Sequence, residues 1–222
     1  MEERWAAVDR YIDSLFVPAD AGLDAALRAS RAAGLPDIQV SPAQGKLLHL
    51  LARAVRARRI LELGTLGGYS TMWLARAVEP GGRVVTLEVN DRHAEVARSS
   101  LTAAGLDAVV DLRLGPALRT LPALAREEAP PFDFIFIDAD KPNIPEYFDW
   151  AVRLSRPGAV IVVDNVVRDG EVVDAASADP SVQGVRRFNA AAAADARVSM
   201  TTIQTVGSKG HDGFAIALVV GV

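Results

Sequence analysis

Three oxygen-bearing side chains stand at the ends of two strongly apolar runs in this chain. Asp138 ends the run in FDFIFIDADK, and Asp164 and Asn165 end the run in AVIVVDN. Two carboxylates and an amide carbonyl are hard oxygen donors, which suit Mg²⁺, Ca²⁺ or Mn²⁺ with water or substrate in the remaining positions. Asp and Asn also form turns after strands, so each of these residues alone has a purely structural explanation. The three together favour a divalent-metal site.

Lys141 follows Asp138 closely enough for a tight turn to bring its amine to the rim of the same site. A neighbouring cation and partial burial both disfavour the ammonium form, which makes the amine a candidate base for a hydroxyl proton. A bound metal would acidify that hydroxyl from the other side. The alternative is a solvated surface lysine, as most lysines are.

A second group of residues surrounds the segment ILELGTLGGYS, which places an apolar strand before a glycine-rich turn and a helix. Gly64, Gly67 and Gly68 let the backbone come close to a ligand. Glu88 ends the next apolar run, where an acid accepts hydrogen bonds from both ribose hydroxyls of an adenosine ligand. Glu62 is costly to bury without a partner, which a positively charged ligand would supply. The alternative is an ordinary turn in which Glu62 forms a salt bridge.

These residues need a sheet that brings strand ends together. Short β-branched runs alternate with helical stretches from Arg59 onward, which is typical of βαβ units and a parallel sheet. Successive strands joined by a helix lie side by side, about 4.8 Å apart, with their carboxyl ends at one edge, where ligands bind. The predicted strands are Arg59–Leu63, Arg83–Val89, Val109–Leu114, Phe132–Asp138 and Ala159–Asp164, and the predicted helices are Tyr69–Val78, Arg92–Ala104, Ala117–Glu127, Pro145–Leu154 and Val182–Ala194.

Both ends of the chain add to this core. Residues 1–57 are predicted to be helical, with Ser41 and Pro42 starting a helix over Ala43–Val55. The last two runs, Arg197–Val206 and Gly213–Val220, are joined by a connection too short for a crossover helix, so they should form an antiparallel hairpin. We expect one domain over residues 1–222, with residues 58–222 as the catalytic α/β core.

The composition excludes several classes of protein. The chain has 222 residues, no cysteine, three histidines and a formal charge of −4. These counts exclude thiolate chemistry and disfavour a zinc site and a nucleic-acid partner. Every apolar run is interrupted before the roughly 20 residues of a membrane span, and the acidic start does not resemble a signal peptide. We therefore expect a cytoplasmic protein without membrane attachment.

A series of motifs in the same order resembles the cation-dependent class I O-methyltransferases, the family of catechol and caffeoyl-CoA O-methyltransferases, especially its small bacterial members. The motifs span nearly the whole chain: VSPAQGKLL, RILELGTLGGYS, VVTLEVN, LGPAL, FDFIFIDADK, GAVIVVDNVVRDGEV and DGFAIAL. The resemblance implies a Rossmann-like methyltransferase fold: a seven-stranded, mostly parallel sheet with an antiparallel last strand, helices on both faces and extra N-terminal helices.

The resemblance also implies S-adenosylmethionine as methyl donor and a homodimer. It makes Lys141 the catalytic base and Asp138, Asp164 and Asn165 the metal ligands, with Asp138 also near the donor. Two oxygens of a catechol-like acceptor would chelate the metal, and the deprotonated hydroxyl would attack the sulfonium methyl group. The residues expected to bind the donor are Val40, Glu62, Gly64, Thr65, Tyr69, Ser70, Glu88 and Ala117.

Three other functions stay open at this point. A nicotinamide-dependent oxidoreductase is disfavoured because the loop is GxxGG and lacks the GxGxxG pattern. A non-catalytic adenosine-ligand binder would have no need of the lysine, and in a metal-independent methyltransferase the acids would be structural. No motif identifies the acceptor. The residues that could border it, or could equally be packing or surface residues, are Trp5, Tyr11, Phe16, Trp150 and Arg168.

Overall fold

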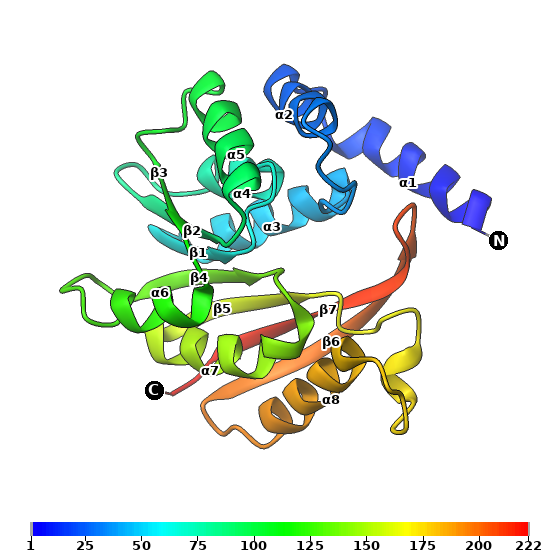
Figure 1. Ribbon diagram of the computed structural model, residues 1–222, viewed down its shortest axis with the longest axis vertical. Helices are drawn as coiled ribbons and strands as arrows, with labels where there is room; N and C mark the ends of the chain where they lie inside the picture. The colour runs from blue at the N-terminus through cyan, green and yellow to red at the C-terminus, as the bar shows by residue number, and fades with distance from the viewer. Residues whose placement is uncertain (1, 222) are drawn as a thin grey trace.

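A computed structural model describes residues 2–221 of the chain. Its seven strands form one sheet in the order β3-β2-β1-β4-β5-β7-β6, with helices on both faces (Figure 1). Strand β7 is antiparallel to both of its neighbours, and the other six strands are parallel to one another. The strands are β1 (Arg59–Leu63), β2 (Arg83–Glu88), β3 (Val110–Leu114), β4 (Phe132–Ile137), β5 (Ser155–Asp164), β6 (Val198–Gly207) and β7 (Gly210–Val219).

The predicted elements are confirmed, with shifted boundaries. Strand β5 begins at Ser155, earlier than the apolar run suggests, and only Ser208 and Lys209 separate β6 from β7. Three helices precede the first strand, as expected for residues 1–57. The helices are α1 (Glu2–Phe16), α2 (Ala21–Ala32), α3 (Pro42–Ala54), α4 (Tyr69–Ala75), α5 (Asp91–Ala103), α6 (Ala117–Leu124), α7 (Ile144–Leu154) and α8 (Pro180–Ala193), with short 3₁₀ turns η1 (Lys141–Asn143) and η2 (Glu171–Val173).

Strand β4 is apolar at every position except Asp133, and its environment explains why. Side chains alternate between the two faces of a strand, and a parallel sheet is covered by helices on both faces. Phe134 and Phe136 therefore pack into the core shared with α3 and α4. Ile135 and Ile137 pack into the opposite core, shared with α7 and α8. All four side chains are fully buried.

The register of the central strands brings the predicted site residues to one level. Leu63 of β1 pairs with Ile137 of β4, and Ile137 pairs with Val163 of β5. Asp138, directly after β4, and Asp164, the last residue of β5, therefore lie at the same edge of the sheet. Gly64 allows β1 and β4 to stay together at this point. A Cβ atom at Gly64 would lie 2.0 Å from the Asp138 carbonyl oxygen, and its φ of +96° suits glycine.

The N-terminal helices differ in how they are held. Helices α2 and α3 contribute Leu23 and Leu48 to the core on their face of the sheet. Helix α1 buries no side chain. It reaches the hairpin tip, where the Ser208 backbone N–H donates to Asp9 Oδ2 at 2.6 Å. Within residues 2–221, no helix is long and apolar enough to cross a membrane.

Candidate functional site

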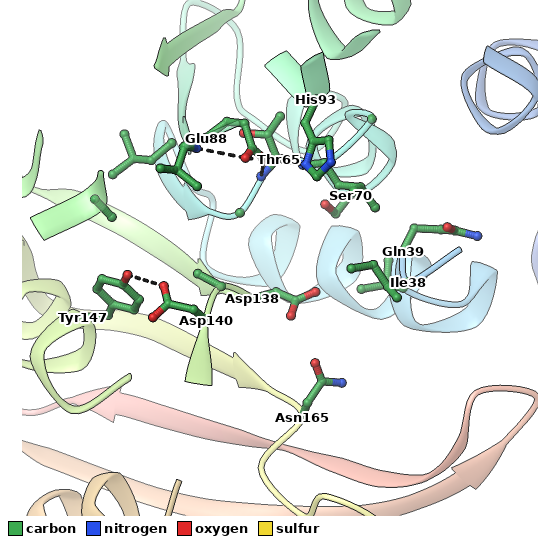
Figure 2. A pocket seen from close by; sticks show the side chains of 18 of the residues that line it. Ile38, Gln39, Thr65, Ser70, Glu88, His93, Asp138, Asp140, Tyr147 and Asn165 are labelled. Atoms are coloured by element: carbon green, nitrogen blue, oxygen red, sulfur yellow. Dashed lines mark hydrogen bonds and ion pairs between the residues drawn. The ribbon is translucent and has the colours of Figure 1, made fainter. Parts of the chain in front are cut away.

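A cavity of about 670 Å³ opens at the carboxyl ends of the parallel strands (Figure 2). Its wall combines the glycine-rich turn after β1, the ends of β2 and β4, the start of α6 and the segment after β5. The site residues predicted from sequence that line it are Val40, Gly64, Thr65, Gly67, Tyr69, Ser70, Glu88, Ala117, Asp138, Lys141 and Asn165, whereas Gly68 is not among the lining residues.

The three predicted oxygen donors come from the ends of β4 and β5. Asp138 and Asn165 extend into the cavity from these two strands (Figure 2). Asn165 has a left-handed backbone (φ 59°), which asparagine tolerates, and its N–H donates to Asp164 Oδ1 at 2.9 Å. Asp164 itself is buried behind the cavity wall.

The Asp164 carboxyl lies in an environment that disfavours its charged form. Burial raises its pKa to about 7, and the negative charge of Asp138 adds to the rise, while Lys141 opposes it. A bound cation would favour the ionised form of Asp164. Oxygen donors of this kind fit a hard divalent ion. Within residues 2–221, no group of three His, Cys, Asp or Glu side chains has metal-binding geometry, so a bound ion would depend on the amide of Asn165 and on water or substrate.

Lys141 is not a solvated surface residue. It begins the 3₁₀ turn η1, is 9% exposed, and its Nζ lies 2.8 Å from Asp138 Oδ1. Helix α8 packs directly on its backbone: a Cβ atom at Gly184 would lie 2.2 Å from the Lys141 carbonyl oxygen. The lysine is therefore fixed at the cavity with its amine beside an acid.

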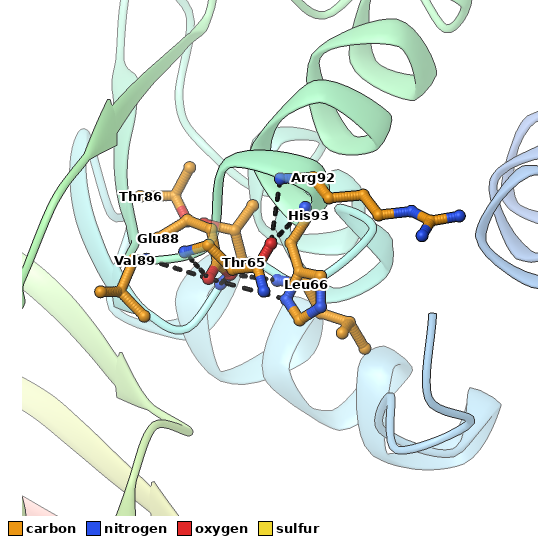
Figure 3. Close-up of polar contacts among 8 residues, drawn as sticks. Thr65, Leu66, Thr86, Glu88, Val89, Arg92 and His93 are labelled. Carbon is orange, nitrogen blue, oxygen red and sulfur yellow. Dashed lines mark hydrogen bonds and ion pairs between the residues drawn. The ribbon is translucent and has the colours of Figure 1, made fainter. Parts of the chain in front are cut away.

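Glu88 fastens the glycine-rich turn to the end of β2 (Figure 3). Its Oε2 accepts the backbone N–H groups of Thr65 at 3.3 Å and Leu66 at 2.9 Å. Its Oε1 accepts those of Val89 and Asn90, both at 2.9 Å. The carboxylate is 7% exposed and still lines the cavity, so a polar ligand can reach it.

Glu62 does not form the salt bridge that was the structural alternative for it. It is fully buried and does not line the cavity, and its partners are hydroxyl groups and not a basic side chain. Ser70 Oγ donates to Oε1 at 2.7 Å, and Thr71 Oγ1 and Thr86 Oγ1 donate to Oε2 at 2.5 and 2.6 Å. Burial raises the Glu62 pKa to about 7, although the three hydroxyl donors lower it. Glu62 thus holds Ser70, which does line the cavity.

The cavity contains polar residues that sequence reasoning missed. His93 places Nδ1 3.7 Å from Glu88 Oε1. Asp140 accepts hydrogen bonds from Tyr147 Oη and Asn143 Nδ2, both at 2.5 Å, and the burial of the phenol and the charge of Asp140 raise the Tyr147 pKa. Tyr147 lies on the apolar face of α7, so in sequence it cannot be distinguished from a core aromatic residue.

The residues considered as acceptor contacts lie in different parts of the molecule. Arg168 lines the cavity, whereas Tyr11 and Phe16 are exposed on α1, each at 67%. Trp5 is half-buried on the same helix. Trp150 packs against the hydrophobic core on the α7 side. Of the residues considered as acceptor contacts, Arg168 alone is among those that line this cavity.

Comparison with known proteins identifies the family. A family model described as "O-methyltransferase" matches residues 21–218. Catechol O-methyltransferases from Niastella koreensis and Mycobacterium tuberculosis are 54% and 55% identical, over 96% of this chain and 96% and 94% of their own lengths. The crystal structure of an O-methyltransferase from Bacillus cereus in complex with SAH has a TM-score of 0.97 and 56% identity, covering 99% of this chain and 100% of that one. These matches confirm the resemblance seen in the motifs and the Rossmann-like methyltransferase fold. The chain belongs to the O-methyltransferase family and is an enzyme of that class.

Proposed function

We propose that this enzyme transfers a methyl group from S-adenosylmethionine to one hydroxyl of a catechol-like or other vicinal-dihydroxy small molecule, with the help of a bound divalent ion. The observation that carries the proposal is that Asp138 and Asn165 line one cavity together with Lys141, whose amine lies beside Asp138, while Asp164 is buried next to Asn165. Two relatives are named catechol O-methyltransferase, and a similar O-methyltransferase from Streptomyces achromogenes is described in complex with SAM.

The donor would occupy the side of the cavity formed by the glycine-rich turn and the end of β2. Backbone contacts near Gly64 suit its methionine part, as does the Ser70 hydroxyl oxygen, whose proton is donated to Glu62 and which can accept a hydrogen bond; Glu88 suits its ribose. Because Glu88 already accepts four backbone N–H groups, ribose hydroxyls would share or replace some of them. The proposed donor contacts are Val40, Gly64, Thr65, Tyr69, Ser70, Glu88, Ala117 and Asp138, all of which line the cavity, with Glu62 supporting Ser70 from behind.

The metal would be held by Asp138, Asp164 and Asn165. Their oxygen-only chemistry fits Mg²⁺, with Ca²⁺ or Mn²⁺ as alternatives. When bound, such an ion would lower the pKa of an acceptor hydroxyl and neutralise the charge of the resulting oxyanion.

The chain's own residues would handle the proton and the geometry. The Lys141 amine accepts the hydroxyl proton at Nζ, and the oxygen then attacks the methyl carbon while the carbon–sulfur bond breaks. No covalent intermediate with the enzyme is needed. The rate would come mainly from holding the oxygen and the methyl group in line, in a cavity whose walls are rigid sheet ends.

The test follows methyl transfer from labelled donor to catechol, with Mg²⁺ and after complete metal removal. We expect product only with Mg²⁺, and we expect Asp164→Asn to lose the metal response. Asp111→Asn is a matched control, because Asp111 is on β3 and pairs with Arg113 at 2.8 Å. Full turnover without metal would refute the metal site, and turnover restricted to monohydroxy acceptors would refute the acceptor class.

The homodimer and the cytoplasmic location stay predictions, which size-exclusion chromatography and cell fractionation can test.

A further inference from the structure

The segment after β5 brings an arginine onto the wall of the cavity. Arg168 has a left-handed backbone, with φ of 56°. The backbone N–H groups of Val167 and Arg168 both donate to Asp212 Oδ1 at 3.0 Å, and that of Gly213 donates to the same oxygen at 2.9 Å. One carboxylate oxygen at the start of β7 therefore fixes the main chain that carries Arg168.

The guanidinium of Arg168 has no close counter-charge. Its nearest acid is Asp212, whose Oδ2 lies 4.0 Å from Nη1. In the same protein, Arg76 and Asp20 form an ion pair at 2.7 Å, the distance typical of a charge-assisted hydrogen bond. Among residues 2–221, nothing accepts a hydrogen bond from the buried Nε of Arg168. The protein thus leaves this guanidinium weakly paired, and its terminal nitrogens have hydrogen-bonding capacity for a ligand.

Arg168 is a positive side chain in a cavity wall that carries several acidic residues. The cavity wall carries the carboxylates of Asp138, Asp140 and Glu88, which would repel an acidic acceptor. Arg168 lies on the same segment as Asn165, which approaches the cavity from the side opposite Glu88 (Figure 2). An acceptor whose hydroxyls lie beside Asn165 would carry its other substituents past this segment.

We propose that Arg168 binds an anionic substituent of the acceptor, so that the preferred acceptors are vicinal-dihydroxy aromatic acids. This inference rests on the proposed function. The planar fork of a guanidinium matches a carboxylate with two parallel hydrogen bonds, and the Arg168 side chain is 32% exposed, so its terminal nitrogens can reach a ligand. The methionine carboxylate of the donor has the same chemistry, and the experiment below separates the two sources.

The experiment compares kcat/KM for 3,4-dihydroxybenzoate with that for uncharged catechol, at saturating S-adenosylmethionine and Mg²⁺. We expect Arg168→Met to lower the ratio of benzoate to catechol by about ten- to a hundredfold, the effect of losing a hydrogen-bonded charge. Arg168→Lys keeps the charge without the fork and should recover part of the ratio. Arg153→Met is the control for net charge, because Arg153 lies on α7 and pairs with Asp149. It should leave the ratio unchanged.

Two results would overturn the role of Arg168: an unchanged ratio, or a raised KM for S-adenosylmethionine with equal losses for both acceptors, which would assign the arginine to the donor. If Arg168→Met does not fold, as judged by circular dichroism, the ratio in Arg168→Lys decides. If the wild-type enzyme methylates catechol but Arg168→Met leaves the benzoate-to-catechol ratio of kcat/KM unchanged, only the inference about Arg168 is refuted. A wild-type enzyme that methylates neither diol refutes the proposed function.

Discussion

Replacing Thr86 by valine tests the hydroxyl network under the glycine-rich turn. Thr86 Oγ1 donates its only proton to Glu62 Oε2 at 2.6 Å. It also lies 2.6 Å from Thr65 Oγ1, so Thr65 must be the donor in that pair (Figure 3). Valine has the shape of threonine without the hydroxyl, so Thr86→Val removes both hydrogen bonds and leaves the packing in place.

The size of the effect follows from the charge of the acceptor. A hydrogen bond to a charged group contributes about 1.5–3 kcal/mol, and a neutral one about 1 kcal/mol. At pH 8 the Glu62 carboxylate is mostly ionised, so losing one of its three donors and the partner of Thr65 should lower the free energy of unfolding by about 2–4 kcal/mol. This is a large part of the roughly 5–15 kcal/mol that stabilises a typical domain, yet the fold should survive.

The loss of stability in Thr86→Val should be larger at pH 8 than at pH 5. The native pKa of Glu62 is about 7, above its ordinary value of 4.5, so the folded state favours the protonated acid. Its contribution to stability is therefore greatest below pH 4.5 and falls as the pH rises through 7. At pH 5 the group is protonated and the lost hydrogen bond is between neutral groups. Thr86→Val should then cost about half as much as at pH 8.

Urea unfolding followed by circular dichroism at pH 5 and pH 8 measures both quantities. Thr86→Ser keeps the hydroxyl and should retain most of the stability at pH 8. Thr120→Val is the control for removing a threonine hydroxyl, because Thr120 donates to the Pro116 carbonyl oxygen at 3.3 Å on an exposed surface. The reasoning fails if Thr86→Val costs no more than Thr120→Val, or if it costs more at pH 5 than at pH 8.

Two further predictions concern the cavity. Lys141→Met should lower kcat by about 10²- to 10⁴-fold, the usual contribution of a positioned base, while the dissociation constant of S-adenosylhomocysteine measured by calorimetry changes little; unchanged turnover would remove the lysine from the mechanism. Gly64→Ala should lower the melting temperature far more than Gly105→Ala. Both glycines have positive φ, but a Cβ at Gly64 would lie 2.0 Å from the Asp138 carbonyl oxygen, whereas a Cβ at Gly105 would meet nothing within 4 Å. Equal shifts of the two variants in a thermal melt would contradict the close approach of β1 and β4.

The parts of the fold that follow from local sequence were predictable. The apolar runs indicated the strands, and neighbouring parallel strands end together, so Asp138, Asp164 and Asn165 could be assigned to one edge of the sheet from their positions in the chain alone. The start of β5 at Ser155 was not visible, because SRPG contains a proline and a glycine, which are typical of a turn.

The environment of each side chain depends on distant segments and could not be predicted. The hydroxyl partners of Glu62 come from α4 and β2, and nothing in the strand RILEL indicates them. The burial of Lys141 depends on Gly184 in α8. Arg168 depends on Asp212, which is 44 residues further along the chain, so a surface position and a place in the site were equally compatible with its local sequence.

The contact between α8 and η1 has a mechanical consequence. Because the Gly184 backbone lies directly against the Lys141 carbonyl, a displacement of α8 toward η1 would have to displace the lysine as well. A change at the α8 side of this contact, far along the chain from Asp138, would therefore act on the position of the proposed base without touching the donor side of the cavity.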